Sequence, residues 1–268
     1  MITSDYHMHT TFSGDGKGTP EEMAEAALRK ELQAICITDH EDYGQTGKEV
    51  MVLTDYEKYV HTIQDARETY KGRLEINLGI EIGLREDLGV HYREFIGKYP
   101  FDFVIGSLHY INGMDPYYGE PFKEYSDEEV YRMTFREMTE CVRKIKDFDV
   151  LGHLDYVVRY GKYQEKEYSY QKFSDEIDEL LQAVIETGRG IELNTAGIKY
   201  GLPFAHPHPD VLKRYRELGG EIITVGSDAH QPKHVGYEFG QAEEILTACG
   251  FKYYTEFKSR KPVFKQIR

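Results

Sequence analysis

Histidines and carboxylates recur in this sequence directly after short apolar runs. His7 and His9 lie two residues apart, and on an extended strand this spacing points both imidazoles to one face, where they can bind one ion. Glu81 lies between Ile80 and Ile82, so we expect a buried acid that needs a partner, and a cation supplies one. The sequence offers these candidate metal ligands: His7, His9, Asp15, His40, Glu81, His109, His153, Asp228 and His230.

Together these candidates indicate a site for two or three metal ions. No single residue of this set establishes a metal site. A His-x-His pair can arise by chance, and Asp15, next to Gly14 and Gly16, is equally suited to a turn. The set contains no cysteine, which excludes a thiolate zinc site, and mixed imidazole and carboxylate ligation suits Zn²⁺, Mn²⁺ or Fe²⁺. Clustered metals generate a metal-bound hydroxide and hold the attacking and leaving oxygens of an in-line displacement. The pattern therefore predicts phosphoester hydrolysis.

Seven apolar runs are predicted to be the strands that position these residues. Most of them lack clean polar and apolar alternation, which is typical of strands buried on both faces. Helical patterns separate the runs, and Thr19 with Glu22, and Ser126 with Glu129, form capping boxes that predict helix starts. The predicted strands are Ile2–Tyr6, Ala34–Thr38, Leu74–Ile82, Phe101–Ser107, Asp149–Gly152, Gly190–Asn194 and Glu221–Gly226.

Strands that alternate with helices predict a parallel α/β architecture. A closed barrel places its active site at the carboxyl ends of the strands. An open doubly wound sheet is the second interpretation, and it also binds ligands outside those ends. Either fold brings six of the eleven histidines together at one end of the molecule.

Length and composition favour one barrel-sized domain over residues 1–268. No apolar run approaches the roughly 20 residues that span a bilayer, and no signal peptide is expected. Cys36, Cys141 and Cys249 form no Cys-x-x-Cys pair and are interpreted as reduced core thiols, which suits the cytoplasm, although one disulfide stays an alternative. The net charge of −14 disfavours a nucleic-acid partner, and no membrane partner is expected. The oligomeric state stays open.

The motifs as a set resemble the PHP (polymerase and histidinol phosphatase) family from His7 to about Gly240. The matching segments are His7-Met8-His9, Thr38-Asp39-His40, Glu81, Ser107-Leu108-His109, Gly152-His153-Leu154-Asp155 and Ser227-Asp228-Ala229-His230. The length and Glu192-Leu193-Asn194-Thr195-Ala196-Gly197 look like the stand-alone histidinol-phosphate phosphatases of histidine biosynthesis. The resemblance implies a distorted seven-stranded parallel (β/α)7 barrel, similar to a TIM barrel.

The resemblance also implies a trinuclear site. His7, His9, Glu81 and Asp228 would hold one ion, and Glu81 would bridge to a second ion on His109 and His153. Asp15, His40 and His230 would hold the third. Some relatives have histidine where Asp15 stands, and relatives often have arginine where this chain has Lys199, which lacks the bidentate fork.

The expected function is hydrolysis of L-histidinol phosphate. Either Asp228 or His230 would pass a proton to the leaving alkoxide, and Arg159 and Lys199 would stabilise the phosphoryl oxygens. His234 is a further candidate for lining the substrate pocket, and Glu41 or Asp42 for contacting the amine or imidazole. The alternatives are a related phosphoesterase for a nucleotide or another small phosphomonoester, and a non-catalytic metal-binding module.

Overall fold

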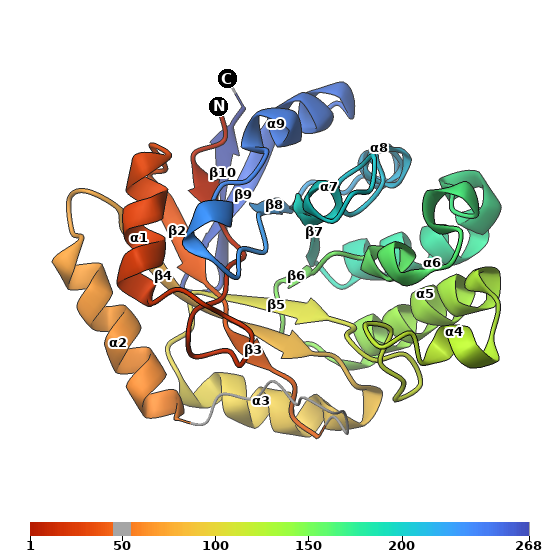
Figure 1. The fold of residues 1–268 in the computed structure, drawn as a ribbon, viewed down its shortest axis with the longest axis horizontal. Helices are drawn as coiled ribbons and strands as arrows, with labels where there is room; N and C mark the ends of the chain where they lie inside the picture. Colours follow the sequence, from red (N-terminus) through yellow and green to blue (C-terminus); the bar gives the residue numbers. More distant parts are fainter. Residues whose placement is uncertain (45–54, 268) are drawn as a thin grey trace.

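Seven parallel strands with helices between them form a nearly closed barrel in the computed structural model, which describes residues 1–44 and 55–267 (Figure 1). The strand order is β1-β2-β4-β5-β6-β7-β8, and the short strand β3 also pairs with β4. The bounds are β1 Ser4–Asp5, β2 Ala34–Ile37, β3 His40–Glu41, β4 Glu75–Gly83, β5 Phe103–Ser107, β6 Val150–Leu151, β7 Gly190–Asn194 and β8 Ile223–Gly226. The barrel closes where the Tyr6 amide donates to the Val225 carbonyl at 2.9 Å and Met8 pairs in parallel with Ala229.

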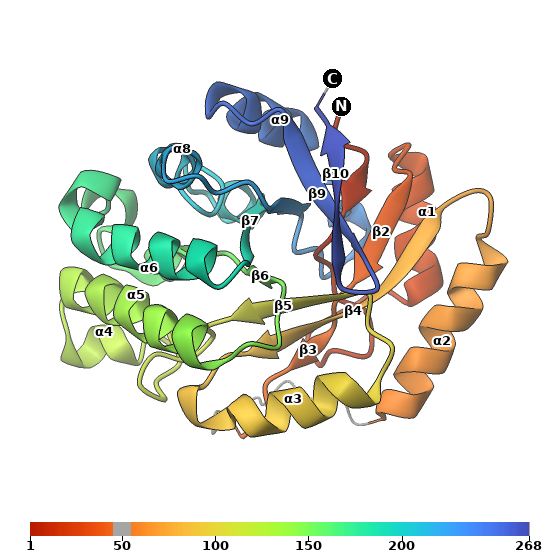
Figure 2. The ribbon, with the colours of Figure 1, turned by 180° about the vertical axis from the view of Figure 1, so that it is seen from behind.

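Helices surround this sheet, and their starts follow the local sequence (Figures 1 and 2). Both expected capping boxes are present, Thr19 with Glu22 and Ser126 with Glu129. The α-helices are α1 Pro20–Arg29, α2 Tyr56–Thr69, α3 Gly89–Lys98, α4 Pro121–Glu124, α5 Asp127–Lys144, α6 Ser174–Glu186, α7 Ala196–Lys199, α8 Pro209–Glu217 and α9 Phe239–Ala248. The 3-10 turns are η1 Glu86–Leu88, η2 Tyr156–Tyr160, η3 Gln164–Lys166, η4 Tyr170–Phe173 and η5 Pro232–His234.

The two faces of the strands pack into different hydrophobic clusters. Ile35 and Ile37 of β2 join the large cluster that includes the helices, whereas Ala34 and Cys36 join a smaller cluster with side chains of β5 and β6. Successive residues of a strand point to opposite faces, so this second cluster fills the barrel interior. Phe257 belongs to it and comes from a hairpin of β9 Tyr253–Lys258 and β10 Lys261–Gln266, which the sequence analysis did not anticipate.

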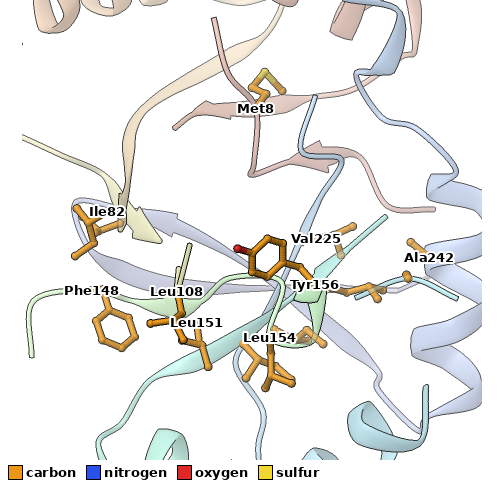
Figure 3. Packing of buried hydrophobic residues seen from close by; sticks show 14 of the residues in the cluster. Met8, Ile82, Leu108, Phe148, Leu151, Leu154, Tyr156, Val225 and Ala242 are labelled. Carbon is orange, nitrogen blue, oxygen red and sulfur yellow. The ribbon is translucent and has the colours of Figure 1, made fainter. Parts of the chain in front are cut away.

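A buried apolar residue separates the members of each paired motif. Met8, Leu108, Leu154 and Ala229 are all fully buried in the large cluster. Figure 3 labels the first three of them among the core side chains. Because neighbouring residues on extended backbone point in opposite directions, anchoring Met8 in the core turns the flanking His7 and His9 toward the barrel mouth.

The closed-barrel prediction is confirmed, and each of the seven predicted strands is present, β7 with the predicted ends and the others with slightly different ends. All three cysteines are buried and free, as expected for core thiols. Among the helices of residues 1–44 and 55–267, none has both the length and the apolar character needed to cross a membrane.

Candidate metal centre

A pocket of about 540 Å³ lies at the carboxyl ends of the strands. Seven of the candidate ligands line it directly: Asp15, His40, Glu81, His109, His153, Asp228 and His230. The other two, His7 and His9, are fully buried, and both contact the carboxylate of Glu81. The structure therefore brings together all nine residues that the sequence pattern singled out.

Glu81 occupies the centre of this arrangement, and its two carboxylate oxygens face different histidines. Oε2 lies 3.2 Å from Nε2 of His7 and 3.5 Å from Nε2 of His9. Oε1 lies 3.0 Å from Nε2 of His153 and 3.3 Å from Nε2 of His109. A carboxylate placed in this way has the geometry needed to serve two neighbouring cations at once.

Asp228 completes the first group, since its Oδ1 lies 3.4 Å from Nε2 of His9. A third group forms around Asp15, whose Oδ2 lies 2.8 Å from Nε2 of His230 and 3.8 Å from Nε2 of His40. The ring of His9 stacks between the rings of His40 and His230, with centroid distances of 4.1 and 4.2 Å. The ligand atoms thus fall into several overlapping groups rather than one.

The spacing and the hydrogen bonding of these atoms fit divalent cations. Two ligand atoms about 2.1 Å from a tetrahedral ion are roughly 3.4 Å apart, which matches the separations around Glu81. Nε2 of His7 lies only 3.1 Å from Nε2 of His9, as two nitrogens sharing one ion would. Oε2 of Glu81 and Nδ1 of His40 lie 3.0 Å apart. Buried Oδ1 of Asp15 and Nδ1 of His153 lack hydrogen-bond partners within the described residues. Such atoms are costly to bury unless a ligand satisfies them.

The electrostatics of the site favour the metal-binding forms of Glu81 and His9. Burial lowers the pKa of His7, His40 and His109, but the charges of nearby acids outweigh it and raise that pKa. Burial raises the pKa of Glu81, but the charges of neighbouring histidines, His7 foremost, outweigh it and hold that pKa well below its usual range. Burial, together with the charges of His40 and His230, holds the pKa of His9 well below its usual range. Glu81 is therefore ionised and the His9 imidazole neutral, and both are free to donate lone pairs.

Two carboxylates that the sequence analysis did not select as ligands orient the histidines from outside. Oε1 of Glu192 lies 2.6 Å from Nδ1 of His7, and Oδ1 of Asp42 lies 2.8 Å from Nδ1 of His109. Partners of this kind fix the tautomer and ring orientation of a metal-binding histidine. Glu192 had a readable signal, because it is an acid inside the apolar strand β7, just as Glu81 is inside β4.

Other polar residues of the motifs support loops. Asp39 accepts hydrogen bonds from the amides of Thr10 and Ser13 and so holds the loop that carries Asp15. Asp155 accepts from Nδ1 of His206 at 2.6 Å, and both side chains are fully buried.

The expected substrate-binding residues have different surroundings. The guanidinium of Arg159 lines the pocket and lies over the rings of Tyr156, Tyr160 and Tyr200 at 5.2, 4.8 and 4.4 Å. Lys199 and His234 are not among the lining residues. Lys199 instead donates to the carbonyl of Asp228 at 2.7 Å, and the ring of His234 packs edge-on against Tyr237.

The acids expected to contact an amine are also engaged elsewhere. Glu41 accepts a hydrogen bond from the hydroxyl of Tyr56, is fully buried, and does not line the pocket. Asp42 does line it, but one of its oxygens is taken by His109.

Known proteins resemble this chain in both sequence and fold. A profile of the PHP domain family matches residues 5–196. The chain is 36% identical over 248 residues to a probable histidinol-phosphatase of Clostridium acetobutylicum, covering 92% of this chain and 94% of the relative. The fold matches the crystal structure of histidinol phosphate phosphatase from Lactococcus lactis subsp. lactis complexed with zinc, L-histidinol and phosphate. That match has a TM-score of 0.88 at 28% identity and covers 97% of this chain and 98% of the other. A putative histidinol phosphatase from Listeria monocytogenes shares the fold, with a TM-score of 0.73, 18% identity, and coverage of 89% of this chain and 99% of that one.

Proposed function

The chain belongs to the PHP domain family, and from this premise we propose that it hydrolyses L-histidinol phosphate to L-histidinol and phosphate. The observation that carries the proposal is a pocket with several overlapping groups of histidine and carboxylate ligand atoms, in a chain that matches a histidinol phosphate phosphatase over 97% of its length. Residues 1–268 act as one phosphatase domain in this proposal. The family match ends at residue 196, yet Asp228 and His230 line the same pocket. A cytoplasmic location stays a prediction.

Three sets of residues hold the metal ions in this proposal. His7, His9, Glu81 and Asp228 form the first set, Glu81 with His109 and His153 the second, and Asp15, His40 and His230 the third. Divalent cations such as zinc, manganese or iron, held at these positions, would polarise the phosphoryl oxygens and lower the pKa of the attacking water. Glu81 would serve two adjacent cations, because its two oxygens face different histidines.

The remaining residues bind and orient the phosphate ester. Arg159 supplies fixed positive charge to the phosphoryl oxygens, and its three tyrosine contacts hold the guanidinium in place. Asp228 or His230 delivers the proton to the leaving alkoxide, since both line the pocket and lie 3.4 Å apart. Lys199 does not contact the substrate in this proposal; it stabilises the position of Asp228 by donating a hydrogen bond to the Asp228 carbonyl.

Phosphate release from L-histidinol phosphate by the purified protein tests this function. We expect hydrolysis that a chelator abolishes and added Zn²⁺ or Mn²⁺ restores, with two or more metal equivalents per chain by elemental analysis. Fewer than about one equivalent after reconstitution would contradict a multinuclear site.

A small phosphomonoester of another kind is the second candidate, because several tyrosines that line the pocket offer stacking surfaces for a nucleobase. A panel of nucleoside monophosphates and phosphotyrosine separates the two. We expect histidinol phosphate to exceed each in kcat/KM by about 100-fold. Equal or faster hydrolysis of a nucleotide would overturn the substrate assignment and leave the metal centre untouched.

A further inference from the structure

One carboxylate in the pocket has no basic partner. The acids that line the pocket are Asp15, Asp42, Glu81, Asp115 and Asp228. All except Asp115 lie between 2.8 and 3.4 Å from their nearest histidine nitrogen. Asp115 forms no ion pair with any lysine, arginine or histidine in the part of the chain that the structure describes. It is therefore the pocket acid whose charge is still available to a ligand.

A tight turn fixes the position of Asp115 in the loop that follows β5. Ile111 and Met114 pair across Asn112 and Gly113, whose φ angles of 49° and 73° are those of a type I′ hairpin turn. Oδ1 of Asp115 then accepts a hydrogen bond from the amide of Tyr117 at 2.8 Å. A backbone amide is neutral, so these contacts orient the carboxylate without cancelling its charge.

The surroundings of Asp115 suit a small organic cation. Tyr110, Tyr117 and Tyr118 of the same loop line the pocket, as does Tyr156 from the loop after β6. Aromatic faces attract ammonium groups. Burial also raises the pKa of Asp115, because part of its solvation is lost, and a bound cation would offset that loss.

The pocket therefore presents two opposite kinds of charge beyond the metal ligands. The guanidinium of Arg159 is available to a phosphoryl group, and the carboxylate of Asp115 is available to a cation. A neutral-tailed phosphate ester would leave the partly buried Asp115 charge unmatched, which costs binding energy. An amine-bearing ester would match both.

We propose that Asp115 binds a protonated amine on the substrate and thereby selects cationic phosphomonoesters. This inference rests on the proposed phosphatase function. It moves amine recognition away from Glu41 and Asp42, which Tyr56 and His109 already engage, to the turn at Asn112 and Gly113.

The test compares L-histidinol phosphate with its desamino analogue, imidazolylpropyl phosphate, which lacks only the ammonium group. The wild-type metalloenzyme should prefer the amine-bearing ester by about 10- to 100-fold in kcat/KM, the range of a charged hydrogen bond. In Asp115→Asn, whose amide oxygen still accepts from the Tyr117 amide, the preference should fall to about 3-fold or less, with little change on the desamino ester. Asp115→Ser is a second variant that retains a local acceptor.

Glu120→Gln is the matched control. Its carboxylate accepts a hydrogen bond from the Asp115 amide but does not line the pocket, so the preference should persist. Calorimetry supplies a readout apart from turnover. The affinity for L-histidinol should fall in Asp115→Asn by about 10-fold or more, while that for inorganic phosphate stays unchanged.

The outcomes separate this inference from the proposed function. If the wild type prefers the amine-bearing ester and Asp115→Asn keeps that preference, Asp115 is not the amine site and the phosphatase function stands. If the wild type does not hydrolyse L-histidinol phosphate, the proposed function fails, and the Asp115 assignment fails with it.

Discussion

The ammonium nitrogen of Lys199 lies 2.7 Å from the carbonyl oxygen of Asp228, a residue whose φ of 50° is left-handed. That conformation costs a non-glycine residue roughly 1 kcal/mol or more, so neighbouring contacts must maintain it. Lys199 supplies such a contact to the backbone of Asp228, the residue whose side chain meets His9. Its charge therefore acts on the site through the backbone of Asp228.

We expect Lys199→Met to lower kcat by about 10- to 100-fold, because Asp228 loses its support, while most of the bound metal is retained. Steady-state kinetics and elemental analysis measure both quantities. Lys162→Met, an exposed lysine over the ring of Tyr163, is the control. A rise in KM with unchanged kcat would instead indicate that Lys199 contacts the phosphate directly.

Glu81→Gln should reduce turnover by about three orders of magnitude or more and release at least one metal equivalent, because a neutral amide cannot balance two dications. Kinetics and elemental analysis again provide the readout. Glu256→Gln replaces an equally buried glutamate in the C-terminal hairpin and should leave both unchanged. Near-normal turnover of Glu81→Gln would show that Glu81 does not bridge.

Glu192→Gln should weaken metal binding by about 10- to 100-fold, because His7 loses the carboxylate that fixes its ring. Competition with a chromophoric chelator measures this affinity. Asp42→Asn, which loosens His109 instead, serves as a comparison and should affect a different ion. Unchanged affinity in Glu192→Gln would mean that packing alone orients His7.

Arg159→Ala should lower kcat/KM by about 100-fold and weaken inhibition by inorganic phosphate, because a preorganised cation is lost. Arg159→Lys should recover only part of this, since lysine lacks the planar fork. Metal content should not change in either variant. Arg73→Ala, a surface arginine over Tyr70, is the control, and normal phosphate inhibition in Arg159→Ala would remove Arg159 from the phosphate site.

The ion-pair cluster of Glu176 with Arg132 and Arg136 predicts a pH dependence of stability. Burial raises the pKa of Glu176, but hydrogen bonds from both arginines outweigh it and lower that pKa below its unfolded value. The stabilisation is therefore present above the unfolded pKa and is lost as pH falls through the folded pKa. We expect Glu176→Gln to cost about 1 kcal/mol in urea unfolding at neutral pH, and less in acid. A pH-independent difference would contradict this origin.

The sequence was sufficient for the architecture and for the set of candidate ligands. Strand candidates buried on both faces and capped helices predicted a parallel α/β fold, and the family resemblance implied a barrel rather than an open sheet. Parallel strands carry their terminal residues to one edge. His7, Glu81 and Asp228 could thus be assigned to one site from local pattern alone. The hairpin Tyr253–Gln266 was not predicted, because its exposed lysines, Lys258 and Lys261, resemble a surface tail.

Only the tertiary structure decided how these residues divide their contacts. The pairing of His7 with Glu192 joins residues 185 positions apart, and its existence depends on barrel closure and register, which local periodicity does not encode. The same holds for Lys199, whose side chain turns to the Asp228 carbonyl rather than into the pocket. It holds also for Asp115, because its lack of a histidine partner is visible only when the other acids that line the pocket are seen to have one. Residue types and spacing determine which groups gather at the barrel mouth, whereas side-chain direction, set by packing across the whole barrel, determines which atom meets which.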